Sequence, residues 1–188
     1  LSINFLAYGE MRGDAFYNNA FNVNADKVVN NSLDNNIFWA SWYNYYRVIK
    51  QANAVIKFTP QVLEAGGISA EKADDVMGQA YCLRAFTYFW IIRIWGDAPL
   101  VTAPYLDSND SFDLPKAAVA DIVEQIHSDL ENASNMIDKN STSRTTFTQT
   151  AAYAINAHVY AWEHKYEETI NMADKVLTNT NYTLANLY

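Results

Sequence analysis

The chain has 188 residues, of which 50% are apolar and 18% are charged, so its composition is that of a folded globular region. Its formal charge of -8 argues against a nucleic-acid backbone or an anionic membrane surface as the main partner. Cys82 is the single cysteine, so no internal disulfide and no cysteine-based metal site can form. The chain begins without a signal-peptide pattern and stops abruptly, which suggests a fragment of a longer protein.

Helical periodicity dominates the first half of the chain. The first thirty residues are rich in Gly, Asn and Asp without a period, which is typical of a loop. Apolar residues then recur at three- and four-residue steps over 34–58, which predicts a helix that Pro60 should end. A second helix is expected over 70–95, with Ser69 as its N-cap and Gly96 as its C-cap.

The most apolar stretch of the chain lies at the end of this second helix. Arg84 and Arg93 bracket a run far shorter than the roughly 20 apolar residues that a membrane-spanning helix needs. Apolar side chains occupy two faces of this helix, so we expect it to be buried between neighbours, with Trp90 in the core. The stretch therefore predicts a central core helix and not a membrane span.

Three more helices are expected in the second half of the chain. One covers 115–138 with Asp113 as its N-cap, Thr148 caps the next, and the last covers 166–177. A very short turn joins the final two helices, whose small and aromatic residues fall near those of a tetratricopeptide repeat. His164 stands in that turn, where the repeat often has Gly. The predicted fold class is all-α, with antiparallel helical hairpins of tetratricopeptide-repeat type after a loop-rich N-terminal segment.

No motif in the chain indicates catalysis. The histidines His127, His158 and His164 lack the spacing of a zinc site, and Cys82 has no recognisable His partner. No nucleophile elbow, phosphate loop or dinucleotide-binding fingerprint is present. We therefore predict no catalytic residue, no metal site and no cofactor.

One stretch, "AFYNNAFNVN" at residues 15–24, has a composition suited to binding sugars. Aromatic rings stack on the apolar C–H face of a pyranose, and amides both donate to and accept from its hydroxyls. The alternative is a loop whose rings pin it to the helices beneath. The candidate ligand-binding residues are Phe16, Tyr17, Asn18, Asn19, Phe21 and Asn22.

Five stretches, in order, carry a resemblance to one family. The strongest is "AYCLRAFTYFWIIRIWGDAPLV", with the family's Leu-Arg-Ala, Tyr-Phe and Gly-Asp-x-Pro-Leu steps. Earlier in the chain, "YGEMRGD" resembles the family's segment near the N-terminus, and "WYNYYRVIKQAN" resembles one of its helices. "DLENASNMI" and "AAYAINAHVYAWEHKYEETINMADKVL" resemble its later repeat helices. Over essentially its whole length the chain resembles the SusD/RagB-like outer-membrane nutrient-binding lipoproteins of Bacteroidetes. His158 and His164 depart from the usual Arg and Gly of the pattern.

The resemblance implies a cell-surface lipoprotein of the outer membrane, anchored through a lipidated N-terminal Cys that this sequence does not include. Such a protein is expected to capture oligosaccharides and deliver them to a SusC-like TonB-dependent transporter. Residues 1–188 would form the single N-terminal helical-repeat region of a longer chain that continues into a C-terminal region. In glycan binders of the family, aromatic and Asn residues just after the segment that "YGEMRGD" resembles help to form the sugar site, which implies that role for residues 15–24.

Two other functions are compatible with the same sequence. Some relatives in this architecture capture oligopeptides, so an oligopeptide-binding subunit of the same kind of uptake complex is the first alternative. Helical repeats also bind peptides on extended surfaces, so an interaction scaffold is the second.

Overall fold

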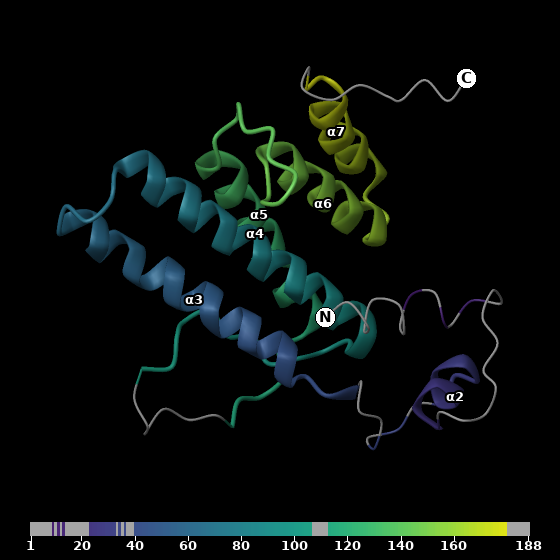
Figure 1. Cartoon of the computed structure of the whole chain (residues 1–188). Helices are drawn as coiled ribbons and strands as arrows, with labels where there is room; N and C mark the ends of the chain where they lie inside the picture. Colours follow the sequence, from purple (N-terminus) through teal and green to yellow (C-terminus); the bar gives the residue numbers. More distant parts are fainter. Residues whose placement is uncertain are drawn as a thin grey trace. The chain divides into compact units, whose positions relative to one another are not determined.

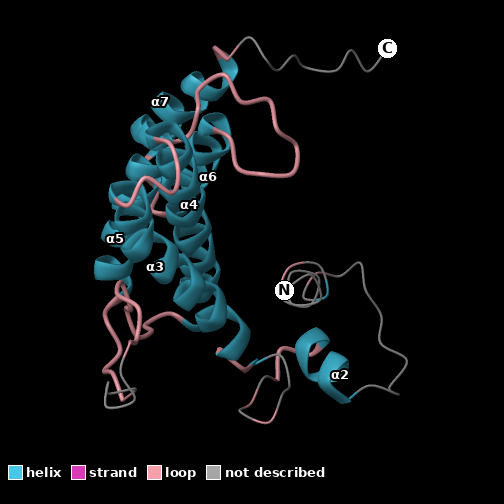
Figure 2. Ribbon diagram, turned by 60° about the vertical axis from the view of Figure 1, so that its left-hand side comes forward, coloured by secondary structure: helices cyan, strands magenta, loops and turns pink. Residues whose placement is uncertain are grey.

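The computed structural model of the chain describes residues 23–32, 40–106 and 113–179, together with residues 9, 11, 13, 34 and 36. Regular structure within these ranges is helical, and a single isolated antiparallel bridge joins Ala98 to Ala117 (Figures 1 and 2). The all-α prediction is thereby confirmed. By its contacts the chain divides into two compact units, Leu1–Arg47 and Val48–Tyr188.

The first unit contains a short helix, α2 (Val23–Val29), in a segment that the sequence analysis assigned to a loop. Polar side chains stabilise the end of this helix. Lys27 Nζ donates to Asp34 Oδ2 at 2.6 Å, and Asn30 Nδ2 donates to Asp26 Oδ1 at 2.8 Å. The loop prediction was wrong here because such local polar contacts leave no apolar period in the sequence.

Helix α3 (Tyr43–Glu64) begins later than expected and continues past Pro60. Proline lacks the N–H that would donate to the Ile56 carbonyl four residues earlier, and it usually kinks or ends a helix beyond the first turn. The neighbouring Thr59 hydroxyl donates to the Val55 carbonyl at 2.7 Å, which adds a side-chain hydrogen bond to this last part of the helix. The chain turns only after Glu64, where Gly66 adopts a φ of 71° that favours glycine. The predicted stop at Pro60 was therefore wrong.

Helix α4 (Ala70–Trp95) is the long core helix that the apolar stretch predicts. Its N-cap is Ser69, whose hydroxyl accepts from the Lys72 N–H at 3.2 Å, and Gly96 ends it with a φ of 71°. Trp90 is half-buried instead of buried, so the expected burial of its ring was wrong. The buried positions are Ala73, Gly78, Ala80, Cys82, Arg84, Ala85, Thr87, Tyr88, Phe89, Ile91 and Ile92.

The segment after α4 caps the helix that follows it. Helix α5 (Val119–Met136) starts after Ala118, whose side chain provides no cap. The carboxylate of Asp97 instead accepts from the Val119 N–H at 3.0 Å. Asp113 was therefore the wrong cap, because the residue that caps α5 lies 22 positions upstream in the sequence.

Helices α4 and α5 pack closely against each other. At Gly78 a β-carbon would lie 2.7 Å from Ile137 Cγ1, so only glycine allows this approach. The buried face of α5 comprises Ile122, Val123, Ile126, Asp129, Leu130, Ala133 and Ser134. Figure 1 shows α3 and α4 side by side and antiparallel, joined by the turn at Gly66.

The last two helices, α6 (Gln149–Trp162) and α7 (Tyr166–Leu177), form the predicted αα-hairpin. The Thr148 hydroxyl caps α6 by accepting from the Ala151 N–H at 3.1 Å, as expected. Helix α6 packs on both α5 and α7. Among the described helices, none is both long enough and apolar enough to cross a bilayer.

His164, in the turn between α6 and α7, adopts a φ of 63°. This left-handed conformation costs a residue with a side chain about 1–2 kcal/mol, whereas glycine adopts it freely. We predict that His164→Gly raises the free energy of unfolding by about 0.5–1 kcal/mol, since part of the gain is offset by the greater freedom of glycine in the unfolded chain.

Urea denaturation of the wild type and of His164→Gly measures the difference in their free energies of unfolding. The matched control is His158→Gly, because His158 is exposed inside α6 and a glycine there should destabilise the helix by about 0.3–0.5 kcal/mol, the difference between the two helix propensities. A loss of stability in both variants would contradict the explanation by backbone strain.

Candidate functional site

The candidate sugar-binding residues of the sequence analysis lie outside the described residues. They are Phe16, Tyr17, Asn18, Asn19, Phe21 and Asn22. Two clusters of polar side chains that join helices belong to the second unit, one buried and one at the surface.

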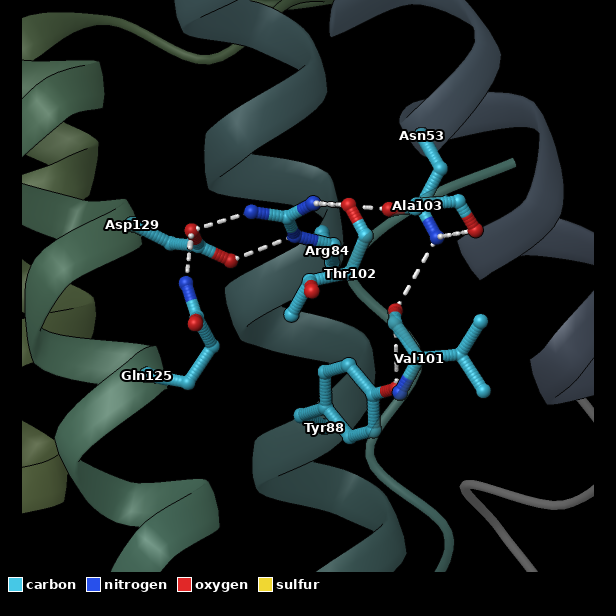
Figure 3. Close-up of polar contacts among 8 residues, drawn as sticks. All are labelled: Asn53, Arg84, Tyr88, Val101, Thr102, Ala103, Gln125 and Asp129. Carbon is cyan, nitrogen blue, oxygen red and sulfur yellow. Dashed lines mark hydrogen bonds and ion pairs between the residues drawn. The ribbon is translucent and has the colours of Figure 1, made fainter. Parts of the chain in front are cut away.

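The buried cluster joins three helices (Figure 3) and is named here the Arg84 cluster. Its side chains are Asn53 from α3, Arg84 and Tyr88 from α4, and Gln125 and Asp129 from α5. Arg84 is 3% exposed and Asp129 is 0% exposed. Removing two charges from water is costly, so such a pair is tolerated only with good geometry and further hydrogen bonds.

Arg84 and Asp129 meet in a bidentate ion pair. Nε of Arg84 donates to Oδ2 at 2.7 Å, and Nη2 donates to Oδ1 at 2.6 Å. Gln125 Nε2 adds a third bond to Asp129 Oδ1 at 2.8 Å. Burial nevertheless raises the pKa of Asp129 above its ordinary value, against the opposing effect of Arg84. The pair therefore positions α5 against α4 more than it adds net stability.

Arg84 also connects α3 to the segment that follows α4. Its Nη1 donates to Asn53 Oδ1 at 2.7 Å and to the Thr102 carbonyl at 3.2 Å. Asn53 Nδ2 in turn donates to the carbonyls of Val101 at 3.0 Å and Ala103 at 3.2 Å. One buried guanidinium thus donates to acceptors on three parts of the chain, including a segment without regular secondary structure.

Tyr88 holds the same segment from α4. The Val101 N–H donates to the Tyr88 hydroxyl oxygen at 2.7 Å, and the hydroxyl lies 3.2 Å from the Val101 carbonyl, to which it donates. Burial raises the pKa of Tyr88 to about 12 and that of the Cys82 thiol to about 12. Both groups therefore stay protonated at neutral pH, so Cys82 behaves as the packing residue that the sequence indicates.

The surface cluster links α5 to the turn between α6 and α7 and is named here the His127 cluster. His127 Nδ1 lies 2.7 Å from Asn156 Oδ1, and its Nε2 lies 2.6 Å from Glu163 Oε2. Both facing atoms are oxygens, so each ring nitrogen can donate to its partner when it carries a proton. The ring stacks on Tyr160 with centroids 4.1 Å apart, and Lys165 Nζ lies 2.8 Å from Glu163 Oε1.

The environment of Glu163 favours its charged form. Partial burial raises the pKa of this carboxyl group, but the bonds from Lys165 and His127 outweigh burial and hold the pKa below its ordinary value. The cluster is an ion-paired contact between helices. Over the part of the chain that the structure describes, no three His, Cys, Asp or Glu side chains are grouped to hold a metal ion.

The family of the chain follows from comparison with known proteins. A family model described as "Starch-binding associating with outer membrane" matches residues 3–161. The chain belongs to the SusD-like family. It is 27% identical over 183 residues to SusD-like protein P38 of Formosa agariphila, across 94% of this chain and 34% of that protein. The resemblance read from the five sequence stretches is thereby confirmed.

Solved structures of SusD-like proteins share the fold. A SusD superfamily protein of Bacteroides vulgatus superposes with a TM-score of 0.82 at 24% identity, over 97% of this chain and 39% of that chain. A structure solved with a xylogluco-oligosaccharide gives a TM-score of 0.78 at 25% identity, over 98% of this chain and 37% of that chain. The chain spans about a third of the length of the curated SusD-like relatives P38, P2 and P25 that it matches.

The sequence analysis used Arg84 to reject a membrane span and as part of the Leu-Arg-Ala step, and it missed the ion-pair partner of Arg84. The signal was present on both sides. Arg84 interrupts an apolar helix, where an unpaired charge is costly, and Asp129 shares the apolar stripe of α5 with Ile126 and Leu130. Two opposite charges on two buried helix faces indicate an ion pair. Only the tertiary structure shows that these two faces pack against each other.

We predict that Asp129→Ala lowers the free energy of unfolding by about 3–5 kcal/mol, because it leaves the Arg84 guanidinium buried without its counter-charge. The double variant Arg84→Met, Asp129→Ala should lose much less than the summed losses of the single variants Arg84→Met and Asp129→Ala. Urea denaturation of the wild type, both single variants and the double variant completes the cycle. Additive losses would show that the pair is not coupled.

We predict that Glu163 makes a pH-dependent contribution to the free energy of unfolding. Its pKa is lowered by folding, so its stabilisation is present above the ordinary value of 4.5 and is lost as the pH falls through the lower folded value. The stability difference between the wild type and Glu163→Gln should therefore be larger at pH 6 than at pH 3. Thermal melts at a series of pH values measure it, and a constant difference would contradict the proposed ion pairing.

Proposed function

We propose that the protein is a cell-surface glycan-binding subunit of an outer-membrane uptake complex. In this proposal it captures oligosaccharides without covalent chemistry and delivers them to a SusC-like TonB-dependent transporter. The observation that carries the proposal is the match of residues 3–161 to a family model described as starch-binding and associated with the outer membrane.

Two further observations support binding in place of catalysis. The relative solved with a xylogluco-oligosaccharide covers nearly all of this chain with the same fold. In the described part of the chain, the groups with raised pKa are locked in packing or hydrogen bonds, as the thiol of Cys82 and the hydroxyl of Tyr88 illustrate. A thiol or phenol with a pKa of about 12 is a poor nucleophile at neutral pH.

We propose residues 15–24 as the sugar-binding segment. Its rings offer apolar faces for stacking, and its amides offer donors and acceptors for hydroxyls. The proposed contacts are Phe16, Tyr17, Asn18, Asn19, Phe21 and Asn22. Attachment to the outer membrane through a lipid anchor, as the family resemblance implies, would place this segment at the cell surface.

Isothermal titration of the full-length protein tests the proposal. The wild type should bind at least one oligosaccharide from a panel of linear and branched glucans and xyloglucans, and Tyr17→Ala should weaken that binding at least tenfold. The matched control is Tyr166→Ala, because Tyr166 is a 63% exposed tyrosine on α7, outside the proposed segment.

Three outcomes have distinct meanings. Loss of saccharide binding in Tyr17→Ala alone supports both the role and the site. Saccharide binding that Tyr17→Ala leaves unchanged supports the role and overturns the site. Binding to oligopeptides but to no saccharide overturns the glycan role in favour of the oligopeptide-binding alternative.

A further inference from the structure

A groove of about 440 Å³ lies between α5, α6 and α7, beside the His127 cluster. Glu124 and Glu131 line it from α5, Tyr153, Asn156 and Tyr160 line it from α6, and Lys175 lines it from α7. The groove belongs entirely to the second unit and does not involve residues 15–24.

Asn156 presents an unused donor to this groove. The residue is 8% exposed, and its Oδ1 faces His127 Nδ1 at 2.7 Å. Its Nδ2 has no hydrogen-bond partner among the described residues, and the atom is not sealed from solvent. A buried amide that keeps two N–H donors free is suited to a ligand with an acceptor, such as a carbonyl oxygen.

Two carboxylates on α5 give the groove its charge. Glu124 and Glu131 are exposed and occupy the same face of the helix, two turns and about 10 Å apart. Neither forms an ion pair within the described part of the chain. Lys175 is instead held over the Tyr153 ring, with its Nζ 4.9 Å from the ring centre. Both carboxylates therefore remain available to a positively charged guest.

The aromatic rings of the groove are not available to stack on a sugar. His127 covers one face of Tyr160, with centroids 4.1 Å apart, and Lys165 Nζ lies 5.9 Å from the centre of the same ring. Lys175 occupies a face of Tyr153. Since saccharide sites depend on open ring faces, this groove differs in chemistry from the proposed glycan site.

We propose that the groove binds an extended basic peptide segment of a partner protein. A backbone carbonyl of the segment accepts from Asn156 Nδ2, and two lysine or arginine side chains pair with Glu124 and Glu131. A chain in the extended polyproline II conformation has three residues per turn and rises about 3.1 Å per residue, so basic residues three positions apart lie on one face, at about the spacing of the two carboxylates. Glu124 and Glu131, which form no ion pair within the described part of the chain, disfavour an acidic segment beside them.

Titration of the full-length, 15N-labelled protein with the blocked peptide Ala-Lys-Ala-Ala-Lys-Ala tests the proposal by NMR. The side-chain amide signals of Asn156 should shift on binding, and the affinity should fall as salt is raised from 50 to 500 mM because the contacts are charged. These signals are assigned from their absence in Asn156→Asp or, if that variant does not fold, from their proximity to the His127 ring.

The double variant Glu124→Gln, Glu131→Gln should raise the dissociation constant at least tenfold. The matched control, Asp74→Asn with Glu167→Gln, removes the same charge from exposed positions on α4 and α7 outside the groove and should bind as the wild type does. Absence of any shift at millimolar peptide, equal shifts with Ala-Glu-Ala-Ala-Glu-Ala, or shifts caused by an oligosaccharide instead would each overturn the proposal. Tyr17→Ala should leave peptide binding unchanged, so this test is independent of the proposed glycan site.

Discussion

The buried guanidinium of Arg84 is the constraint on which the second unit depends. It donates to Asp129 on α5, to Asn53 on α3 and to the carbonyl of Thr102, so three helices and an irregular segment meet at one side chain. A buried ion pair adds little net stability, because desolvation offsets most of the attraction. Its effect is on specificity, since any other arrangement of α3, α4 and α5 leaves a charge or a carbonyl without a partner.

This core explains why the helical part is suited to serve as a scaffold. Its polar groups are committed to one another, and burial keeps the Cys82 thiol and the Tyr88 hydroxyl protonated. Reactive chemistry needs the opposite, a titratable group that is reachable and poised near the working pH. The polar groups that are available to ligands therefore lie at the surface, in loops and grooves.

The two surfaces proposed as binding sites differ in how their aromatic residues are used. In residues 15–24 the sequence intersperses rings with amides, a composition suited to sugar hydroxyls and C–H faces. In the groove beside α5, His127 and Lys175 already cover the rings of Tyr160 and Tyr153. The free groups there are the amide of Asn156 and the carboxylates of Glu124 and Glu131, which suit a peptide carrying positive charge. A SusD-like chain with both surfaces would capture a nutrient at one and contact a protein at the other.

Local signals in the sequence were sufficient for α4, α6 and α7 and for their ends, but not for α2 or for the ends of α3. The predicted caps Ser69, Thr148 and Gly96 are the caps in the structure, because a cap depends only on residues within one turn. The repeat pattern likewise marked the position of His164, where the turn needs the positive φ that glycine adopts most easily. The five family stretches identified the SusD-like family by the same kind of local pattern.

Only the tertiary structure decided which residues far apart in the sequence are in contact. Asp97 caps α5 from 22 positions upstream, and Arg84 pairs with Asp129 across 45 positions. The free amide of Asn156 likewise depends on where His127 of α5 meets α6. The physical reason is the same in each case. Periodicity tells which face of a helix is buried, but the partner of that face depends on how all the faces pack together at once.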